Sequence, residues 1–137
     1  MRTLAIDYGE RRVGLALSDP TGFLASSLKV ILRESDKQVA MDIAKVVEEH
    51  EVEQIVLGYP ITLQGEVGKK AQHVESFSRL LGQHVSVPIT LFDERLTTVS
   101  AQRVLIEADM SRKKRKTVVD AVAATILLQT YLDSKSH

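Results

Sequence analysis

The stretch RTLAIDYGERRVGLALSD, residues 2–19, decides the fold of this chain. Its two apolar runs, 3–8 and 12–18, have the length of β-strands, and the turn sequence YGER between them predicts an antiparallel pair. Asp7 stands at the end of the first run, directly before Tyr8 and Gly9. A carboxylate so close to a core is costly unless a partner offsets its charge. Asp7 is therefore the first candidate functional residue.

The rest of the chain alternates strands with helices. Ser35 and Gln38 form a capping-box pattern, which predicts a helix that begins there and ends near His50. The loop YPITLQGEVG at 59–68 has the turn residues and the length of a functional loop. Apolar periodicity predicts further strands over 23–31, 52–58 and 87–92, and further helices around 74–81, over 97–109 and over 117–133.

This order of elements predicts an α/β fold with a five-stranded mixed sheet and helices on both faces. The first three strands form an antiparallel meander, whereas helical crossovers make the strands at 3–8, 52–58 and 87–92 parallel. A single domain is expected to cover residues 1–137, as is usual for this length. Ligand sites in such sheets lie at the carboxyl ends of the parallel strands. Here those ends are Asp7, Gly58 and the pair Asp93 and Glu94.

Composition limits the partners and the compartment. Lysine plus arginine and aspartate plus glutamate both number 18, so any contact with nucleic acid must be local rather than driven by a global positive field. The absence of cysteine excludes a disulfide framework and a thiolate metal site, and fits a reducing compartment. The sequence shows neither a signal peptide nor an apolar stretch long enough to span a membrane. We expect a cytoplasmic protein with no membrane partner.

Three acids are candidates for one site: Asp7, Glu94, and Asp120 in the apolar segment KTVVDAVAATILL. If the strand at 52–58 lies between the other two parallel strands, Asp7 and Glu94 start about 10 Å apart, too far for direct contact. Mg²⁺ or Mn²⁺ could join carboxylates at such a sheet edge and offset their mutual repulsion. A cluster of this kind suits phosphodiester hydrolysis, in which divalent cations stabilise the attacking and leaving oxygens.

Each acid also has a structural interpretation. Asp7 could hydrogen-bond the backbone of its own turn. Glu94 could form a surface ion pair with Arg95 or Arg103. Asp120 lies three residues after Thr117, the spacing of a capping box, and an acid in the first turn of a helix is favoured by the helix dipole.

The basic run RKKRK at 112–116 lies directly before Thr117 and is expected to connect the last two helices. Arg112, Lys113 and Lys114 could grip phosphates by local charge, or the run could be a solvated segment that ends a helix. Lys69, Lys70 and the neighbouring loop are further candidates for contact with a substrate.

Four segments in order resemble the YqgF family of RNase H-like proteins, which are described as pre-16S rRNA nucleases or Holliday-junction-resolvase homologues. The segments are AIDYGERRVGLALSD at 5–19, IVLGYPITLQGEVGKKAQHVESF at 55–77, FDERLTTVSAQRVL at 92–105 and KTVVDAVAATILLQTYL at 116–132. Together they cover nearly the whole chain. The resemblance implies an RNase H-like fold that carries divalent-metal nuclease chemistry.

The resemblance also assigns residues. Asp7 in DYG, Glu94 in DER and Asp120 in VVDAVAA match the three metal-binding and catalytic acids. Arg12, Arg95 and Thr98 match further motif positions and are interpreted as contacts to phosphate or to the acids. One departure separates the chain from the resolvases, which carry a glutamate at the end of the fourth strand where this sequence has Gly58, Tyr59 and Pro60.

The resulting hypothesis is a metal-dependent endonuclease that processes the 5′ end of pre-16S rRNA, with precursor rRNA and ribosomal particles as partners. One alternative is a Holliday junction resolvase acting on branched DNA, which would need a dimer to cut two strands symmetrically. Another is a ribosome-assembly or nucleic-acid-binding factor without catalysis, in which the acids only support the fold. The residues alone leave the oligomeric state and the choice between RNA and DNA open.

Overall fold

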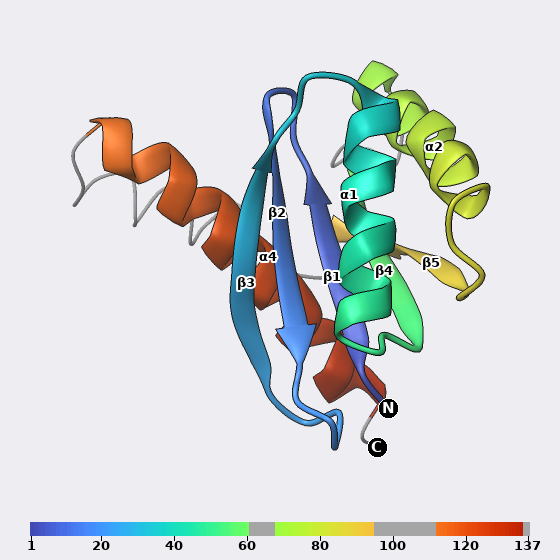
Figure 1. Ribbon diagram of the computed structural model, residues 1–137. Helices are drawn as coiled ribbons and strands as arrows, with labels where there is room; N and C mark the ends of the chain where they lie inside the picture. Colours follow the sequence, from blue (N-terminus) through green and yellow to red (C-terminus); the bar gives the residue numbers. More distant parts are fainter. Residues whose placement is uncertain (61–67, 95–111, 136–137) are drawn as a thin grey trace.

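The computed structural model describes residues 1–60, 68–94 and 112–135, and for 112–120 it describes the helical backbone only. Within these residues a five-stranded sheet has the order β3-β2-β1-β4-β5 (Figure 1). The strands are β1 (Thr3–Tyr8), β2 (Arg12–Ser18), β3 (Ala25–Leu32), β4 (Gln54–Tyr59) and β5 (Ile89–Asp93). The helices are α1 (Asp36–Glu49), α2 (Lys69–Gly82) and α4 (Arg112–Lys135).

The predicted mixed topology is confirmed. β1 pairs antiparallel with β2, and β2 pairs antiparallel with β3. β1, β4 and β5 are parallel, with β4 in the middle. All six residues of β1 are buried, because this strand has a paired neighbour on each side and helices over both faces.

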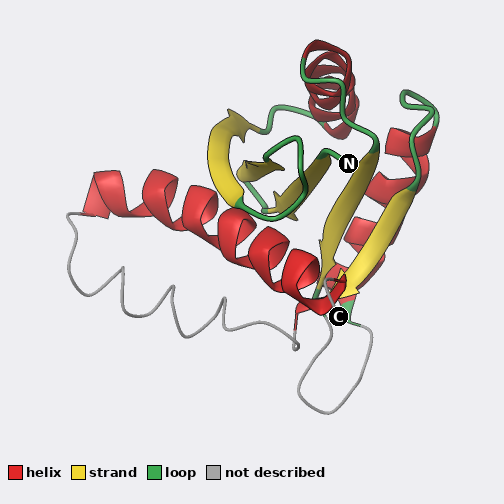
Figure 2. Ribbon diagram, turned by 90° about the horizontal axis from the view of Figure 1, so that it is seen from below, coloured by secondary structure: helices red, strands yellow, loops and turns green. Residues whose placement is uncertain are grey.

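Helices cover both faces of the sheet, as expected. α1 and α2 pack on one side, which we call the α1/α2 face, and α4 crosses the other, the α4 face (Figure 2). Side chains alternate along each strand. Leu4, Ile6 and Tyr8 of β1 therefore pack in the α1/α2 core, whereas Ala5 packs against α4. The same alternation directs Asp7 to the α4 face.

The first helix follows its sequence signal closely. Ser35 is the N-cap of α1, its hydroxyl accepts a hydrogen bond from the Gln38 amide, and the Gln38 side chain returns to the Ser35 backbone. The helix ends at the C-cap His50. The capping box predicted from the sequence is thus confirmed.

The third strand begins at Ala25 rather than at residue 23. One carboxylate oxygen of Asp19 accepts hydrogen bonds from the amides of Gly22, Phe23 and Leu24 at 2.8, 2.9 and 3.3 Å. These bonds hold Phe23 and Leu24 in the turn, so the strand starts only after them.

The last helix begins earlier than predicted, at Arg112 instead of residue 117. The basic run 112–116 therefore lies inside α4 and is not a connection, and Thr117 is not an N-cap. Lysine and arginine have high helix propensity, so the helix continues past the apolar segment that packs on the sheet. The helix predicted over 97–109 and most of the loop at 59–68 lie outside the described residues. None of the described helices is long and apolar enough to cross a membrane.

Polar contacts join α4 to the β2–β3 hairpin. The Gln129 side chain accepts a hydrogen bond from the Ala25 amide and donates one to the Phe23 carbonyl, both at 3.0 Å. The hydroxyl groups of Ser27 and Thr125 lie 2.8 Å apart. These contacts fix the path of α4 across β3, the edge strand farthest from β5.

Candidate functional site

Asp7 lies near the carboxyl end of the central strand and is 5% exposed. Its partner across the pair with β2 is Gly14. On the other side Ile6 pairs with Leu57, which places Asp7 beside Gly58 of β4. Since glycine has no side chain, neither neighbouring strand presents one beside the Asp7 carboxylate on the α4 face. This leaves room at the sheet edge for a group from elsewhere.

Glu94, which directly follows β5, takes up part of that room. A Cβ atom built on Gly58 would lie 2.6 Å from Oε1 and 3.3 Å from Cδ of Glu94. The Glu94 carboxylate therefore lies over β4, in the space that a larger residue at position 58 would fill. Because adjacent strands are about 4.8 Å apart, this carboxylate reaches to within one strand spacing of β1. The structure thus brings Asp7 and Glu94 to the same edge and the same face.

α4 closes this site from above. The same Cβ position on Gly58 would lie 3.2 Å from Cδ2 of Leu127. Asp120 stands two helical turns before Leu127, about 10.5 Å along the axis. It directly precedes Ala121, whose carbonyl lies 3.5 Å from the Ser27 hydroxyl on β3. The Asp120 side chain lies outside the description, so its convergence with the other two acids stays a prediction.

The predicted basic residues are distributed unequally. Arg12 opens β2, and strand alternation with Gly14 and Ala16 puts it on the α4 face, at the same end of the sheet as Asp7. Arg95 and Thr98 lie outside the described residues. The first turn of α4 carries Arg112, Lys113 and Lys114 and projects beyond β3 (Figures 1 and 2). Of these candidates, only Arg12 can be placed beside the acids.

The two placed acids fit a hard divalent cation. Mg²⁺ binds in proteins through one or two carboxylates, with water or phosphate oxygens completing its shell. Asp7 and Glu94 supply two such carboxylates, and the bare backbone at Gly58 is what allows the second to approach. In the described part of the chain, His, Cys, Asp and Glu form no group of three or more that could hold a metal ion. A third carboxylate or imidazole ligand would therefore have to come from outside the described side chains.

On the opposite face of this edge, a polar network anchors the end of β1. The Tyr8 hydroxyl donates to Oδ1 of Asp36 at 2.5 Å, and Nε of Arg33 donates to the same oxygen at 2.9 Å. The Arg33 guanidinium lies 4.9 Å from the centroid of the Tyr8 ring. Burial, and next the hydrogen bond to Asp36, raise the pKa of Tyr8 well above its ordinary value. The residue that follows Asp7 is thus held neutral and fixed to the start of α1.

This network was not predicted from the sequence. Two signals for it are present: Tyr8 directly follows Asp7, and Arg33 and Asp36 have the i, i+3 spacing of helical ion pairs. These signals are common on protein surfaces, and only the fold brings them to the end of β1.

Comparison with solved structures identifies the fold. RuvC from Thermus thermophilus, in complex with a Holliday junction substrate, aligns with a TM-score of 0.62 over 99% of this chain and 97% of that chain, at 13% identity. The fowlpox virus resolvase, in complex with Holliday junction DNA, aligns with a TM-score of 0.54 over 100% of both chains, at 10% identity. The fold is therefore the RNase H-like fold of the RuvC type.

The sequence then gives the family. The model of the RuvX family, described as "Holliday junction resolvase", matches residues 1–134, and the chain belongs to this family. A protein of Clostridium acetobutylicum is 46% identical over 134 residues, covering 98% of this chain and 99% of the relative. A protein of Shouchella clausii is 45% identical over 139 aligned positions, covering 100% and 98%. Both are named "Putative pre-16S rRNA nuclease". The resemblance to a nuclease family is confirmed.

Proposed function

We propose that this protein is a divalent-metal-dependent endonuclease that processes the 5′ end of pre-16S rRNA. The observation that carries the proposal is the position of the Glu94 carboxylate over Gly58, beside Asp7 at the carboxyl edge of the sheet. The names of relatives that match nearly the whole chain support the choice of substrate. We place the reaction in the cytoplasm, with precursor rRNA as the ligand, either free or within ribosomal particles.

Asp7 and Glu94 would hold Mg²⁺ or Mn²⁺, with Asp120 as the third acid that the resemblance implies. When bound, the cation supplies positive charge that stabilises the oxygens of the phosphodiester during hydrolysis. Asp7 contributes a carboxylate fixed by a fully buried strand. Glu94 contributes one whose path is set by the missing side chain at Gly58. Arg12, on the same face, would bind a phosphate oxygen of the substrate.

The other basic candidates would extend this contact. Arg95 and Thr98 follow Glu94 in the chain and are assigned to phosphate by their motif positions. Arg112, Lys113 and Lys114, at the projecting end of α4, would bind parts of the strand farther from the cleaved bond.

The test compares precursor 16S rRNA and a four-way DNA junction side by side, each with Mg²⁺, with Mn²⁺ and with a chelator. Precursor rRNA is supplied both free and within ribosomal particles. We expect metal-dependent cleavage near the 5′ end of the mature sequence and no cleavage of the junction. Asp7→Asn, Glu94→Gln and Asp120→Asn should each abolish cleavage. Asp42→Asn is the matched control, since Asp42 is a carboxylate on α1, which packs on the opposite face.

Cleavage of the junction alone would favour the second candidate function, a Holliday junction resolvase. The family description and the shared fold favour this candidate. The geometry at Gly58 argues against it, because a glutamate at the end of β4, as in resolvases, would collide with Glu94 in its present position. If purified protein cleaves neither substrate with either metal, the chain is a binding or assembly factor and the proposal fails.

A further inference from the structure

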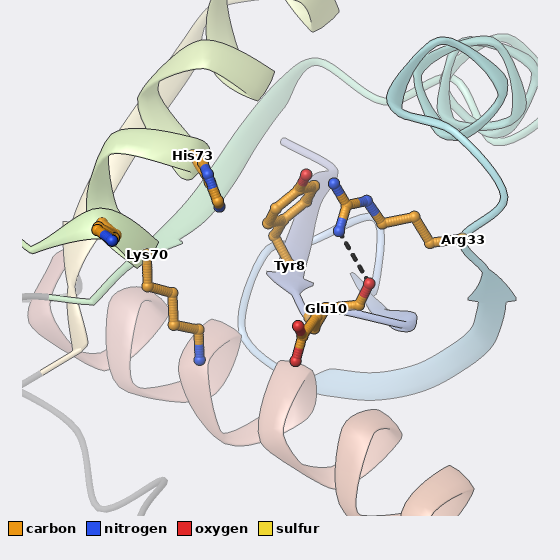
Figure 3. Close-up of a pocket in the computed structure, with 7 residues that line it drawn as sticks. Tyr8, Glu10, Arg33, Lys70 and His73 are labelled. Carbon is orange, nitrogen blue, oxygen red and sulfur yellow. Dashed lines mark hydrogen bonds between the residues drawn. The ribbon is translucent and has the colours of Figure 1, made fainter.

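A hollow of about 420 Å³ lies at the end of β1, on the α1/α2 side of the sheet. Figure 3 shows Tyr8 and Glu10 between Arg33 on one side and the side chains of α2 on the other. Three separate segments build it: the end of β1 with the turn that follows, the connection from β3 to α1, and the first two turns of α2. The lining residues are Tyr8, Gly9, Glu10, Arg33, Lys69, Lys70 and His73.

The lining of this hollow is positively charged, although the chain as a whole has no net charge. Arg33, Lys69 and Lys70 supply three cations, against the carboxylate of Glu10 in the lining and that of Asp36, which pairs with Arg33. Lys69, Lys70 and His73 are exposed to solvent. Their position at the start of α2 adds the positive end of the helix dipole. The hollow is thus a local site for an anion.

The back of the hollow is rigid. Arg33 donates from Nε to Asp36 and from Nη1 to the Glu10 carbonyl at 2.8 Å, which fixes its guanidinium before any ligand arrives. Phe77 stacks on the Tyr8 ring with centroids 4.6 Å apart, while Arg33 also lies over that ring. Tyr8 is only 6% exposed, so its ring offers little surface on which a base could stack. The site recognises charge rather than a base.

The hollow adjoins the acid site. Asp7 and Tyr8 are consecutive in β1, so their Cα atoms are about 3.8 Å apart and their side chains point to opposite faces of the sheet. The acid site and the hollow therefore lie on the two faces of the sheet at the same point of β1. Gly9, which follows, lines the hollow without a side chain. A strand crossing this edge of the sheet would meet both sites.

We propose that this hollow binds a backbone phosphate of the RNA strand whose neighbouring phosphodiester is cleaved at Asp7 and Glu94. The proposal rests on the proposed function for the choice of RNA as ligand. Guanidinium and ammonium groups are the usual protein partners of phosphate. The carboxylates of Glu10 and Asp36 offset two of the three cations, and the remaining positive charge suits a singly charged diester better than a polyphosphate. Binding here is expected to be independent of sequence and to position the strand for cleavage.

The test uses the full chain with Lys69→Ala and Lys70→Ala combined. The matched control combines Lys45→Ala in α1 with Lys135→Ala at the end of α4, which removes the same charge away from the hollow. Binding to labelled single-stranded precursor RNA is followed by fluorescence anisotropy in a chelator at several salt concentrations. For a single strand, each lost phosphate contact should reduce the slope of log K against log[salt] by about 0.7, so the double variant, which loses the one phosphate bound in the hollow, should show a slope shallower by about 0.7.

The control should keep the slope of the original protein. Lys69→Arg combined with Lys70→Arg retains both positive charges and should keep this slope as well. With metal, the double variant should show a raised KM and an unchanged kcat. Inorganic phosphate should compete with RNA for the original protein and less for the double variant, which distinguishes a bound diester from general screening. Equal slopes for the double variant and the control, or no RNA binding by the original protein, would overturn the proposal.

Cleavage is scored separately. If the protein cleaves no RNA, but the salt dependence of RNA binding falls only in the Lys69→Ala and Lys70→Ala variant, the phosphate site is supported and the nuclease proposal fails. If the protein cleaves RNA, but the two variants show equal salt dependence, the nuclease proposal is supported and the phosphate site fails.

Discussion

The Glu94 carboxylate lies in the space above Gly58, where the Cβ of any other residue would come within 2.6 Å of Oε1. An acid carried by β5 thereby approaches an acid carried by β1, although β4 lies between the two strands. The site therefore depends on a residue that has no side chain and no chemistry of its own.

Gly58→Ala tests this dependence. The methyl group would displace the flexible end of Glu94 and press on Leu127, so we expect a destabilisation of about 1 to 2 kcal/mol. Displacing the carboxylate by about 1 Å should lower cleavage by about 100-fold. Thermal melting and cleavage rates measure the two effects. Gly82→Ala is the control, because a Cβ there meets nothing within 4 Å, so it should leave cleavage unchanged and should not lower the melting temperature.

Asp7→Asn should remove the coupling between metal and stability. If Asp7 binds Mg²⁺, the original protein gains about 2.7 kcal/mol at a metal concentration 100 times Kd. The variant keeps the size of the side chain but lacks the charge that attracts the cation, so its melting temperature should not respond to Mg²⁺. Calorimetry with and without Mg²⁺ provides the measurement. A variant that melts higher with Mg²⁺, by as much as the original protein does, would refute the metal assignment.

Tyr8→Phe should change how stability depends on alkaline pH. At pH 7 the loss of the hydrogen bond to Asp36 should cost about 1 to 2 kcal/mol. The pKa of Tyr8 is raised in the folded state, by burial first and by Asp36 next. Its contribution is therefore fully present below pH 10, the ordinary pKa of tyrosine, and falls above it, because the unfolded chain releases a proton that the folded chain keeps.

The difference in unfolding free energy between the original protein and Tyr8→Phe should accordingly shrink as the pH rises above about 10. Urea titrations from pH 8 upward measure it. A difference that stays constant over this range would show that Tyr8 loses its proton equally easily in both states.

Replacing Arg112, Lys113 and Lys114 together by alanine tests the projecting end of α4. Alanine has the highest helix propensity, so the helix should persist and the melting temperature should change little. If these residues bind phosphates, RNA binding should weaken and its salt dependence should flatten. RNA binding is measured by anisotropy titrations at several salt concentrations, and the Lys45 and Lys135 variant is the control. Unchanged binding would identify the run as a solvated helix end.

The order of the strands could be predicted because it follows from local signals. The turn at Gly9 makes β1 and β2 antiparallel, and the Ser35 capping box starts the helix that crosses back to a parallel strand. The start of α4 could not be predicted from apolar periodicity. Periodicity reports only the part of a helix that contacts a core, and residues 112–116 are charged and continue past it.

That Asp7 and Glu94 lie at the same sheet edge was predicted from the order of the strands. Strand order gives the backbone separation of the two acids, about 10 Å, but not the path of a side chain across the strand between them. That path depends on Gly58, which the sequence marks as the end of a parallel strand and as a departure from resolvases, but not as the space that a carboxylate occupies. The hollow beside Tyr8 could not be predicted for a related reason, since Arg33 and His73 line one space only in the folded chain.

The covering of the α4 face by the last helix has a consequence for synthesis. Ala5, Ala16 and Val56 on that face leave the ribosome before Leu127 and Leu128, which cover them, because a chain emerges from its N-terminus. Until α4 is made, the apolar residues of this face are exposed and no helix covers the acid site. The acid site that the proposed cleavage of RNA requires is thus complete only once α4 has been made and has packed on the sheet.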